Sequence, residues 1–160
     1  MNTNKYAYNL HTVQKLLPIE SCLSEGVTIS YYGDNGSVPP PYHYSCHIVV
    51  SHDSVRVYIN TDYRQNFVYD TKAIISRIRY NRFLSQLKAQ GIWTTSPDYS
   101  HGVGGSTYSL KVEKGEDTVF YGVLGETLVV ENGSLNDTFK ILLTDSQQDA
   151  LFNPKQFLGI

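Results

Sequence analysis

Residues 27–59 decide the fold, and they read VTISYYGDNGSVPPPYHYSCHIVVSHDSVRVYI. Apolar and polar residues alternate within 27–32, 44–50 and 55–59, and a period of two is typical of strands with one buried face. The turn at 51–54 is short and polar, so the second and third segments are predicted to form an antiparallel hairpin. The sequence therefore predicts a sheet that the rest of the chain must cover.

The same alternation returns later in the chain and predicts a second hairpin. Its strands are expected at 108–112 and 119–123, joined by the turn KGED. A further short strand is expected at 65–69. Two hairpins with helical sequence between them predict one α+β domain over residues 1–160, with a mainly antiparallel sheet of about five to seven strands.

The sequence between the hairpins predicts one long helix packed on a face of the sheet. Asp70 or Thr71 can cap its start, it runs to about Gln90, and Gly91 ends it. Its apolar residues fall on two opposite sides of the helical wheel. The helix therefore either breaks near 79–81 or lies between two apolar layers.

Short helices are expected near both ends of the chain. Apolar residues at i, i+3 and i+4 within 9–17, followed by Pro18, are typical of a short helix. Capping residues and apolar spacing predict two more helices at 134–143 and 145–152. Residues 1–8 are polar and are expected to form a flexible tail.

The composition is that of an ordinary globular protein, with 41% hydrophobic and 18% charged residues. No apolar run approaches the roughly 18 residues of a membrane span. The net charge of −2 does not favour a surface for nucleic acid or for an anionic membrane. Since the N-terminal residues lack the apolar stretch of a secretion signal, we expect a cytoplasmic protein.

Cysteine and histidine do not indicate a metal site. Cys22 and Cys46 are the two cysteines of the chain. Two free thiols are favoured, and a Cys22–Cys46 bridge stays open only for an oxidising compartment. His43 and His47 share a face of an extended segment, but four residues along a strand separate them by roughly 13 Å. We therefore expect no bound metal and no cofactor.

A catalytic site is not favoured either. Asp98, His101 and Ser106 lie within one glycine-rich loop, whereas catalytic triads are usually assembled from separate, rigid elements. The segment GVGGST at 102–107 lacks the lysine of a phosphate-binding loop. We expect no catalytic residue among them.

The composition stands out in its tyrosine content, with 13 tyrosines against 6 phenylalanines. Tyrosine offers a large, rigid contact area with a polar tip, which suits binding surfaces. Loop 33–43 is stiffened by three consecutive prolines, and loop 94–106 is rich in glycine and hydroxyl groups. The prolines could instead turn a sheet corner while Tyr42 packs on the core. The candidate binding residues on and beside these loops are Tyr32, Tyr42, His43, Tyr44, Tyr99 and His101.

The order of the segments resembles the emfourin-type proteinaceous inhibitors of thermolysin-like metalloproteases. The likeness rests on VTISYY at 27–32, GDNG at 33–36, GIW at 91–93, Asp98 and TYSLKV at 107–112. It covers about residues 27–143 in layout, while PPPYH at 39–43 and the first 26 residues depart from it. The resemblance implies a small sheet-and-helix inhibitor. No site residue is carried over, because no inhibitory motif matches.

These observations favour a non-enzymatic protein-binding module, a small inhibitor or immunity-like protein that occupies a partner's surface. The partner is expected to be a protein rather than nucleic acid or membrane, and the oligomeric state is left open. The alternative is a small-molecule or nucleotide-binding domain, perhaps with hydrolase activity. Its site would lie between loops 33–43 and 94–106, with His43, Tyr44, Asp98 and His101 converging on one cavity.

Overall fold

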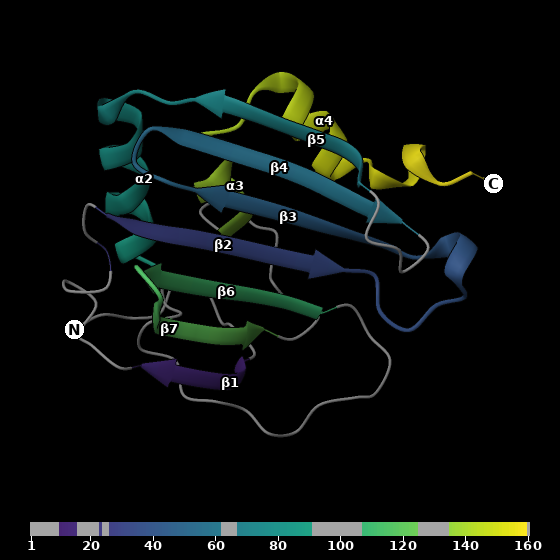
Figure 1. Ribbon diagram of the computed structural model, residues 1–160, viewed down its shortest axis with the longest axis horizontal. Helices are drawn as coiled ribbons and strands as arrows, with labels where there is room; N and C mark the ends of the chain where they lie inside the picture. Colours follow the sequence, from purple (N-terminus) through teal and green to yellow (C-terminus); the bar gives the residue numbers. More distant parts are fainter. Residues whose placement is uncertain are drawn as a thin grey trace.

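The computed structural model describes residues 10–15, 23, 26–61, 67–90, 107–124 and 135–159. Its main element is one seven-stranded sheet in the order β1-β7-β6-β2-β3-β4-β5 (Figure 1). Every pairing is antiparallel, which confirms the predicted sheet. The strands are β1 Leu10–Lys15, β2 Val27–Asp34, β3 Tyr44–Val50, β4 Ser54–Thr61, β5 Phe67–Ile74, β6 Thr107–Lys114 and β7 Asp117–Leu124.

Both predicted hairpins form. Strands β3 and β4 pair around the turn at 51–54, with Val50 opposite Val55. Strands β6 and β7 pair around Gly115, whose φ of 62° is a left-handed conformation that suits glycine. Strand β2 lies between the two hairpins and pairs with β3 and β6. Residues 27–34 therefore form the central strand of the sheet.

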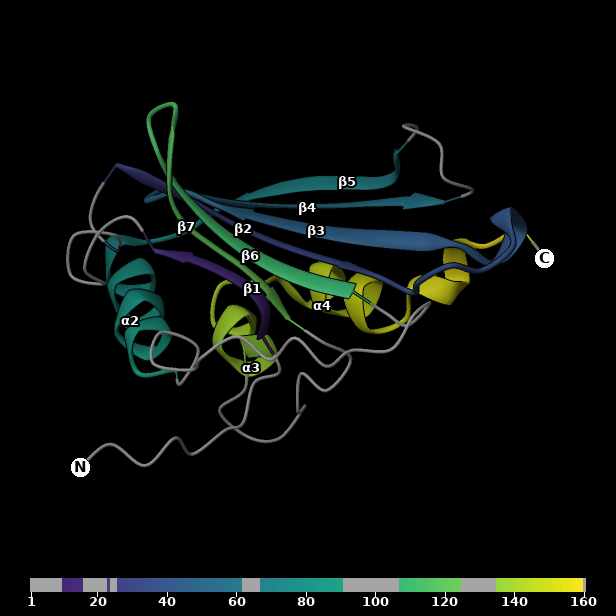
Figure 2. The ribbon, with the colours of Figure 1, turned by 90° about the horizontal axis from the view of Figure 1, so that it is seen from below.

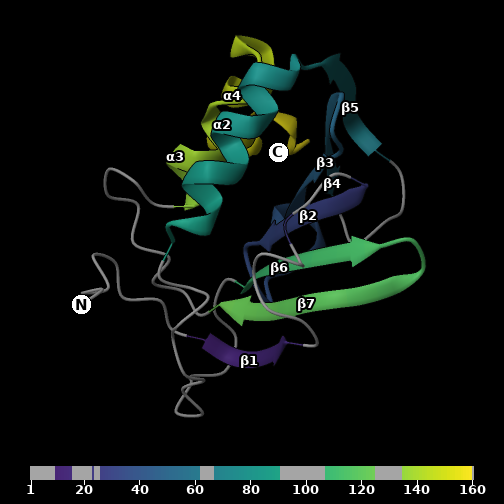
Figure 3. The same ribbon diagram turned by 90° about the vertical axis from the view of Figure 1, so that its left-hand side faces the viewer.

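All described helices lie on one side of the sheet (Figure 2). They are α2 Arg77–Lys88, α3 Leu135–Lys140 and α4 Asp145–Phe152, followed by the 3-10 turn η3 Pro154–Phe157. The 3-10 turn η1 Pro40–Tyr42 lies at the end of the sheet, in the connection between β2 and β3. Figure 3 shows the helices gathered beside β2 to β5, while β6, β7 and β1 continue the sheet beyond them. None of these helices is both long and apolar enough to span a membrane.

The central helix is shorter than predicted. Helix α2 has 12 residues and begins after Ser76, whose side chain accepts a hydrogen bond from the backbone N–H of Arg79. Residues 70–74 belong instead to the edge strand β5, which pairs with β4. The predicted helix has apolar residues on two opposite sides of its wheel, but no second apolar layer covers Ile74 and Ile78, because both are exposed. One face alone, with Tyr80, Phe83, Leu84 and Leu87, packs on the core.

The prediction of a helix at 9–17 was wrong for the described part of that segment. Residues 10–15 form β1, which pairs antiparallel with the outer edge of β7. Backbone hydrogen bonds to β7 satisfy more polar groups than one short helical turn would, so tertiary pairing overrides the local spacing. The two C-terminal helices, α3 and α4, are confirmed. Residues 1–8, the expected tail, lie outside the described residues.

The core fills the space between the sheet and the helices. Ile29, Val57 and Leu110 are fully buried on the helix side of their strands and pack with Phe83 and Phe139 in one cluster. Burying such side chains stabilises the fold by about 1.5–3 kcal/mol each before entropy is counted. This side of the sheet is called the covered face.

Two buried glutamine side chains tie the helices in place. The Gln147 Nε2 of α4 donates to the Thr71 Oγ1 of β5 at 3.2 Å. The Gln90 Nε2, just after α2, donates to the Thr138 Oγ1 of α3 at 2.9 Å. Because a buried polar group left unbonded costs about 1–3 kcal/mol, these pairs fix where the helices sit on the sheet.

Candidate functional site: an open sheet face and a covered pocket

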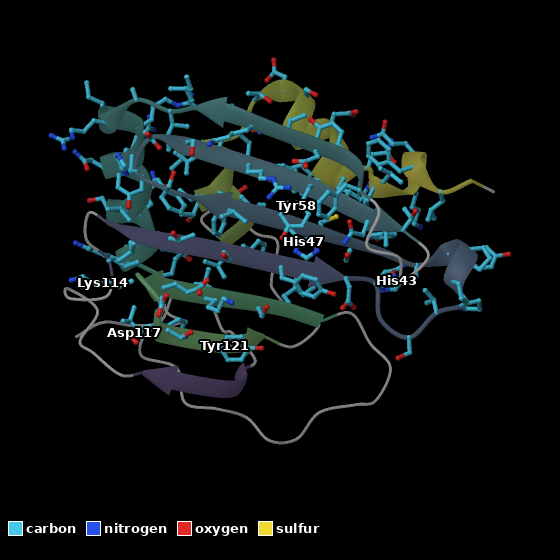
Figure 4. All side chains as sticks on the ribbon, in the orientation of Figure 1. His43, His47, Tyr58, Lys114, Asp117 and Tyr121 are labelled. Atoms are coloured by element: carbon cyan, nitrogen blue, oxygen red, sulfur yellow. The ribbon has the colours of Figure 1, made fainter. Side chains whose placement is uncertain are left out.

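The opposite side of the sheet carries no described helix and is called the open face (Figure 2). Two rows of side chains cross it, because residues paired across strands stand side by side. One row is Ser109, Tyr32, His47, Tyr58 and Asp70, and the other is Tyr121, Lys111, Ser30, Val49, Arg56 and Lys72. Figure 4 shows His47, Tyr58 and Tyr121 on this face, turned toward the viewer.

Four rings form a continuous aromatic band on the open face: Tyr32, His47, Tyr58 and Phe67. The ring centroids of Tyr32 and His47 lie 4.7 Å apart in an edge-on contact. His47 and Tyr58 stack at 4.2 Å with 12° between their planes. Tyr58 and Phe67 follow at 4.8 Å. The band crosses four neighbouring strands, β2 to β5.

The stacking turns the ring edges outward. His47 and Tyr58 stack across adjacent strands, so their planes stand up from the sheet and each ring covers a face of the other. The band therefore presents polar edges, the phenol groups and the imidazole nitrogens. A platform for nucleic-acid bases needs free ring faces instead, so this geometry suits hydrogen-bonding contacts better.

A hollow of about 240 Å³ lies beside the aromatic band. The small side chains of Ser30 and Ser109 leave this space between larger neighbours. The residues that line it include Tyr32, His47, Tyr58, Lys111 and Tyr121. It is large enough to accept one side chain of another protein.

Arg56 and Lys111, two of the three cations in these rows, are each close to a carboxylate, whereas Lys72 is exposed. Arg56 donates two hydrogen bonds to the carboxylate of Asp70, at 2.8 and 2.9 Å, and its guanidinium lies over the rings of Tyr58 and Phe67. These bonds lower the pKa of Asp70. The Lys111 Nζ lies 3.4 Å from the Glu113 carboxylate. These two pairs are neutral, and Lys72 adds one positive charge at the β5 edge of the face.

His47 is the neutral centre of the band. Partial burial, and then the charge of Arg56, lower its pKa to about 4. Its Nε2 lies 3.3 Å from the Ser45 Oγ, so the hydroxyl can satisfy it. Beside it, burial and the hydrogen bond from the Tyr32 hydroxyl to Asp34 raise the pKa of Tyr32. Both groups are therefore uncharged hydrogen-bonding groups at neutral pH.

A second cavity, the covered pocket, lies on the helix side, where the sheet meets the C-terminal helices. Its volume is about 230 Å³. Its lining is mainly apolar and aromatic: Tyr31, Gly33, Asp34, Tyr44, Cys46, Ile48, Tyr108, Phe139, Leu143, Leu151, Phe152 and Pro154. Burial raises the pKa of the Cys46 thiol to about 12. Burial, together with nearby Cys46, also raises the pKa of Tyr44 and Tyr108.

One wall of the covered pocket depends on a glycine. Gly33 pairs with Tyr108, and a Cβ built on Gly33 would stand 2.8 Å from the Tyr108 ring. The ring therefore needs a residue without a side chain opposite it. Tyr108 continues a stack through Tyr31 to Phe139, with centroids 6.2 and 5.0 Å apart.

The predicted site residues do not gather in one place. Tyr32 lies on the open face and Tyr44 lines the covered pocket. Tyr42, in the 3-10 turn η1, is 52% exposed, so it is not the core residue that the alternative for this loop required. His43 is only 6% exposed and offers little surface to a partner, and its role in binding stays a prediction.

The remaining predictions about this site concern residues outside the described part of the chain. Loop 94–106, with Asp98, Tyr99 and His101, lies outside it. The convergence of His43, Tyr44, Asp98 and His101 on one cavity therefore stays a prediction. Cys22 is also outside, but Cys46 is a free thiol, and the Cys22–Cys46 bridge is therefore not formed.

Sequence reasoning missed most of the open face. His47, Tyr58, Phe67, Lys111 and Tyr121 were not among its candidates. The alternation placed His47, Tyr58 and Lys111 opposite the apolar residues, but it grouped Tyr121 with Val119 and Val123, and an irregularity in the pairing of β6 with β7 puts Tyr121 beside Lys111 instead. What was lacking was the pairing between strands that brings them together.

The described residues hold no group of three or more His, Cys, Asp and Glu side chains that could bind a metal ion. Comparison with models of known protein families and with curated proteins found no match for this chain. The two cavities and the surfaces around them are therefore the features of the molecule that bear on its function.

Proposed function

We propose that this protein is a non-enzymatic protein-binding module and that the open face of its sheet is the contact surface. It would act by occupying its partner's surface, as a small inhibitor or immunity-like protein does. The observation that carries the proposal is the hollow beside the aromatic band, on a sheet face without a described helix. A sheet that needs only one covered face for its core leaves the other available for recognition.

The residue types of the open face favour a protein partner. Tyrosine and arginine are enriched among the residues that contribute most to protein interfaces. Here Tyr58 and Arg56 stand together, with the guanidinium 4.6 Å from the ring centroid. Both are already ordered by their neighbours, so binding would cost little further side-chain entropy.

The same face does not favour nucleic acid. Phosphate contacts need several available cations, whereas Arg56 is bonded to Asp70 and Lys111 lies close to Glu113, which leaves Lys72 as the one cation of the two rows without an ion pair among the described residues. Base stacking needs free ring faces, and those of His47 and Tyr58 cover each other. A near-neutral protein surface that inserts one side chain into the hollow suits the geometry better.

A cytoplasmic location is part of the proposal. The free thiol of Cys46 fits a reducing compartment, where disulfides rarely persist. The partner is then a protein of the same compartment.

Affinity capture from the cells that produce the protein tests the proposal. The purified protein is immobilised, exposed to nuclease-treated extract, and the bound proteins are quantified by mass spectrometry. Ser30→Trp fills the hollow, and Tyr58→Ala opens the aromatic band. We expect each to reduce recovery of a stoichiometric partner by about tenfold or more.

Two further variants make the capture decisive. Gln86→Ala changes an exposed residue of α2, away from the open face, and should bind like the wild type. Tyr42→Ala tests whether loop 33–43 contributes, and we expect a smaller loss than with Ser30→Trp. The proposal fails if no protein is recovered at stoichiometric level. It also fails if Ser30→Trp and Tyr58→Ala, shown to be folded, recover as much partner as Gln86→Ala.

A further inference from the structure

We propose that two copies of this chain associate edge to edge, with β5 of one copy pairing antiparallel with β5 of the other. Strand β5 is the last strand of the sheet, and no other described strand pairs with its outer side (Figure 1). It is eight residues long. An edge strand offers unpaired backbone groups to another chain, so natural edges are usually short, charged or covered. The residues that line the open-face hollow come from other strands, so the two proposed contacts can fail separately.

The backbone of β5 alternates between bonds to β4 and groups that face outward. The Ile75 N–H donates to the Asp53 carbonyl at 2.9 Å, and the same register continues without a shift to Tyr69. In an antiparallel pair, hydrogen-bonded residues occur at every second position. In this stretch the odd-numbered residues therefore bond to β4, and the even-numbered residues turn their N–H and C=O groups outward.

The even-numbered side chains of β5 are exposed as well. Asp70 and Lys72 end the two rows of the open face, and both are exposed. Ile74, at one end of the strand, is 88% exposed, and Val68, near the other end, is 42% exposed. This edge carries one charge of each sign between two apolar residues. It can therefore complement a second copy of itself.

One register matches all of these groups. If Thr71 of one copy lies opposite Thr71 of the other, a two-fold axis passes between them. Each Asp70 then stands opposite the Lys72 of the other copy, and each Ile74 comes opposite Val68 at the end of the pairing. Even-numbered residues pair with even-numbered residues, so the outward-facing N–H and C=O groups of the two strands meet.

The charges select this register over its neighbours. Moving the axis to Asp70 places two carboxylates opposite each other, and moving it to Lys72 places two ammonium groups opposite each other. Like charges directly opposite destabilise a strand pair, whereas unlike charges stabilise it. Arg56 donates two hydrogen bonds to Asp70, and a carboxylate has about four acceptor positions, so a lysine of the second copy can join them. Since both copies use the same edge, association ends at two copies.

Light scattering tests the association by measuring the molar mass of the purified full chain at increasing concentration in low salt. One strand pair is a small interface, so we expect half of the chains to be dimeric at about 1–100 μM. The dimer should weaken as salt is added, because salt screens the exposed charges. A monomer mass at every concentration up to about 500 μM, well above this range, would overturn the proposal.

Two charge variants test the register. Asp70→Lys and Lys72→Asp each place like charges opposite each other at both symmetric positions, so each variant alone should dimerise about tenfold more weakly or less. An equimolar mixture of the two variants restores unlike charges at both positions and should dimerise like the wild type. Circular dichroism confirms that each variant is folded. Failure of the mixture to recover the dimer, or unchanged dimerisation of either variant alone, would refute the pairing.

A pair of isoleucine variants locates the contact independently of charge. Ile74→Asn removes an apolar residue from the paired edge and should weaken the dimer. Ile78→Asn is the matched control, because Ile78 is 82% exposed but lies on α2, outside the pairing. Ser30→Trp fills the open-face hollow and should dimerise like the wild type. Loss of the dimer in Ile78→Asn or Ser30→Trp, with Ile74→Asn unaffected, would place the contact elsewhere and refute the proposal.

Discussion

The two faces of the sheet are built from the same strands but differ in how they are used. Val57 and Ile48 point into the core and are buried, whereas their neighbours Tyr58 and His47 stand half-buried on the open face. One step along a strand therefore separates a stabilising residue from a residue available to a partner. If the open face is the proposed contact surface, substitutions on the two faces should change stability and binding separately.

The largest expected effect tests the covered face. Phe83→Ala removes a fully buried ring from α2 and should lower the free energy of unfolding by about 3–5 kcal/mol. Tyr58→Ala removes a ring of similar size from the open face and should cost only about 1 kcal/mol, since it leaves no core cavity. Denaturant unfolding of both variants measures the difference. Equal losses would show that the open face also stabilises the fold.

The second prediction concerns Gly33, where β2 makes room for a wall of the covered pocket. Gly33→Ala places a Cβ about 2.8 Å from the Tyr108 ring and should destabilise the fold by about 1–3 kcal/mol through overpacking. In Tyr108→Ala the ring is absent, so adding Gly33→Ala should then cost much less. Thermal unfolding of the two single variants and the double variant gives the coupling. Additive losses would mean that the close approach is not the cause.

The third prediction uses pH to probe the open face. The pKa of His47 falls from 6.5 to about 4 on folding. Between these values the unfolded chain binds a proton that the folded chain does not, so stability decreases as the pH is lowered from 6.5 toward 4. Because the ring is only partly buried and solvent screens it, we expect the loss to be about 1–2 kcal/mol.

Two histidine variants identify the group responsible. Unfolding measured at several pH values should lose part of its pH dependence in His47→Gln. His52, in the exposed turn between β3 and β4, provides the matched control, and His52→Gln should keep the dependence. An unchanged pH profile in His47→Gln would show that the ring does not titrate in this window.

Much of the sheet could be predicted from the sequence because alternation is a local signal. The hairpin at 44–61 also sets its own register: once Val50 pairs with Val55, His47 must stand opposite Tyr58. That part of the aromatic band was within reach of sequence reasoning. The position of Tyr32 beside His47 could not be predicted in the same way. Loop 33–43 is too long to fix the register in which β2 pairs with β3.

The errors in the prediction share one physical cause. Residues 10–15 and 70–74 have local patterns that fit helices, yet both form edge strands because a neighbouring strand offers hydrogen bonds. The covered pocket could not be predicted for the same reason, since Tyr108 and Phe152 meet only after the C-terminal helices pack on the sheet. These features depend on pairing between segments that lie far apart in the sequence. A short stretch of sequence, read by itself, does not show such pairing.

The prediction with the smallest expected effect asks whether the charges on the open face stabilise the fold or order the aromatic rings. Arg56 and Asp70 form a two-bond ion pair, but each side chain is about 40% exposed, and exposed pairs contribute about 0.2–1 kcal/mol. Asp70→Asn should therefore lower the free energy of unfolding by less than about 1 kcal/mol, and by less still at high salt. Arg56 also lies over Tyr58 and Phe67, so we expect the ion pair to matter more for ordering these rings than for stability.

Proton NMR of the Tyr58 ring tests this ordering role. If the chemical shifts of the ring change in Asp70→Asn while the free energy of unfolding barely changes, the ion pair orders the ring. A loss of several kcal/mol would instead make the pair part of the stabilising structure and weaken the contrast between the two faces.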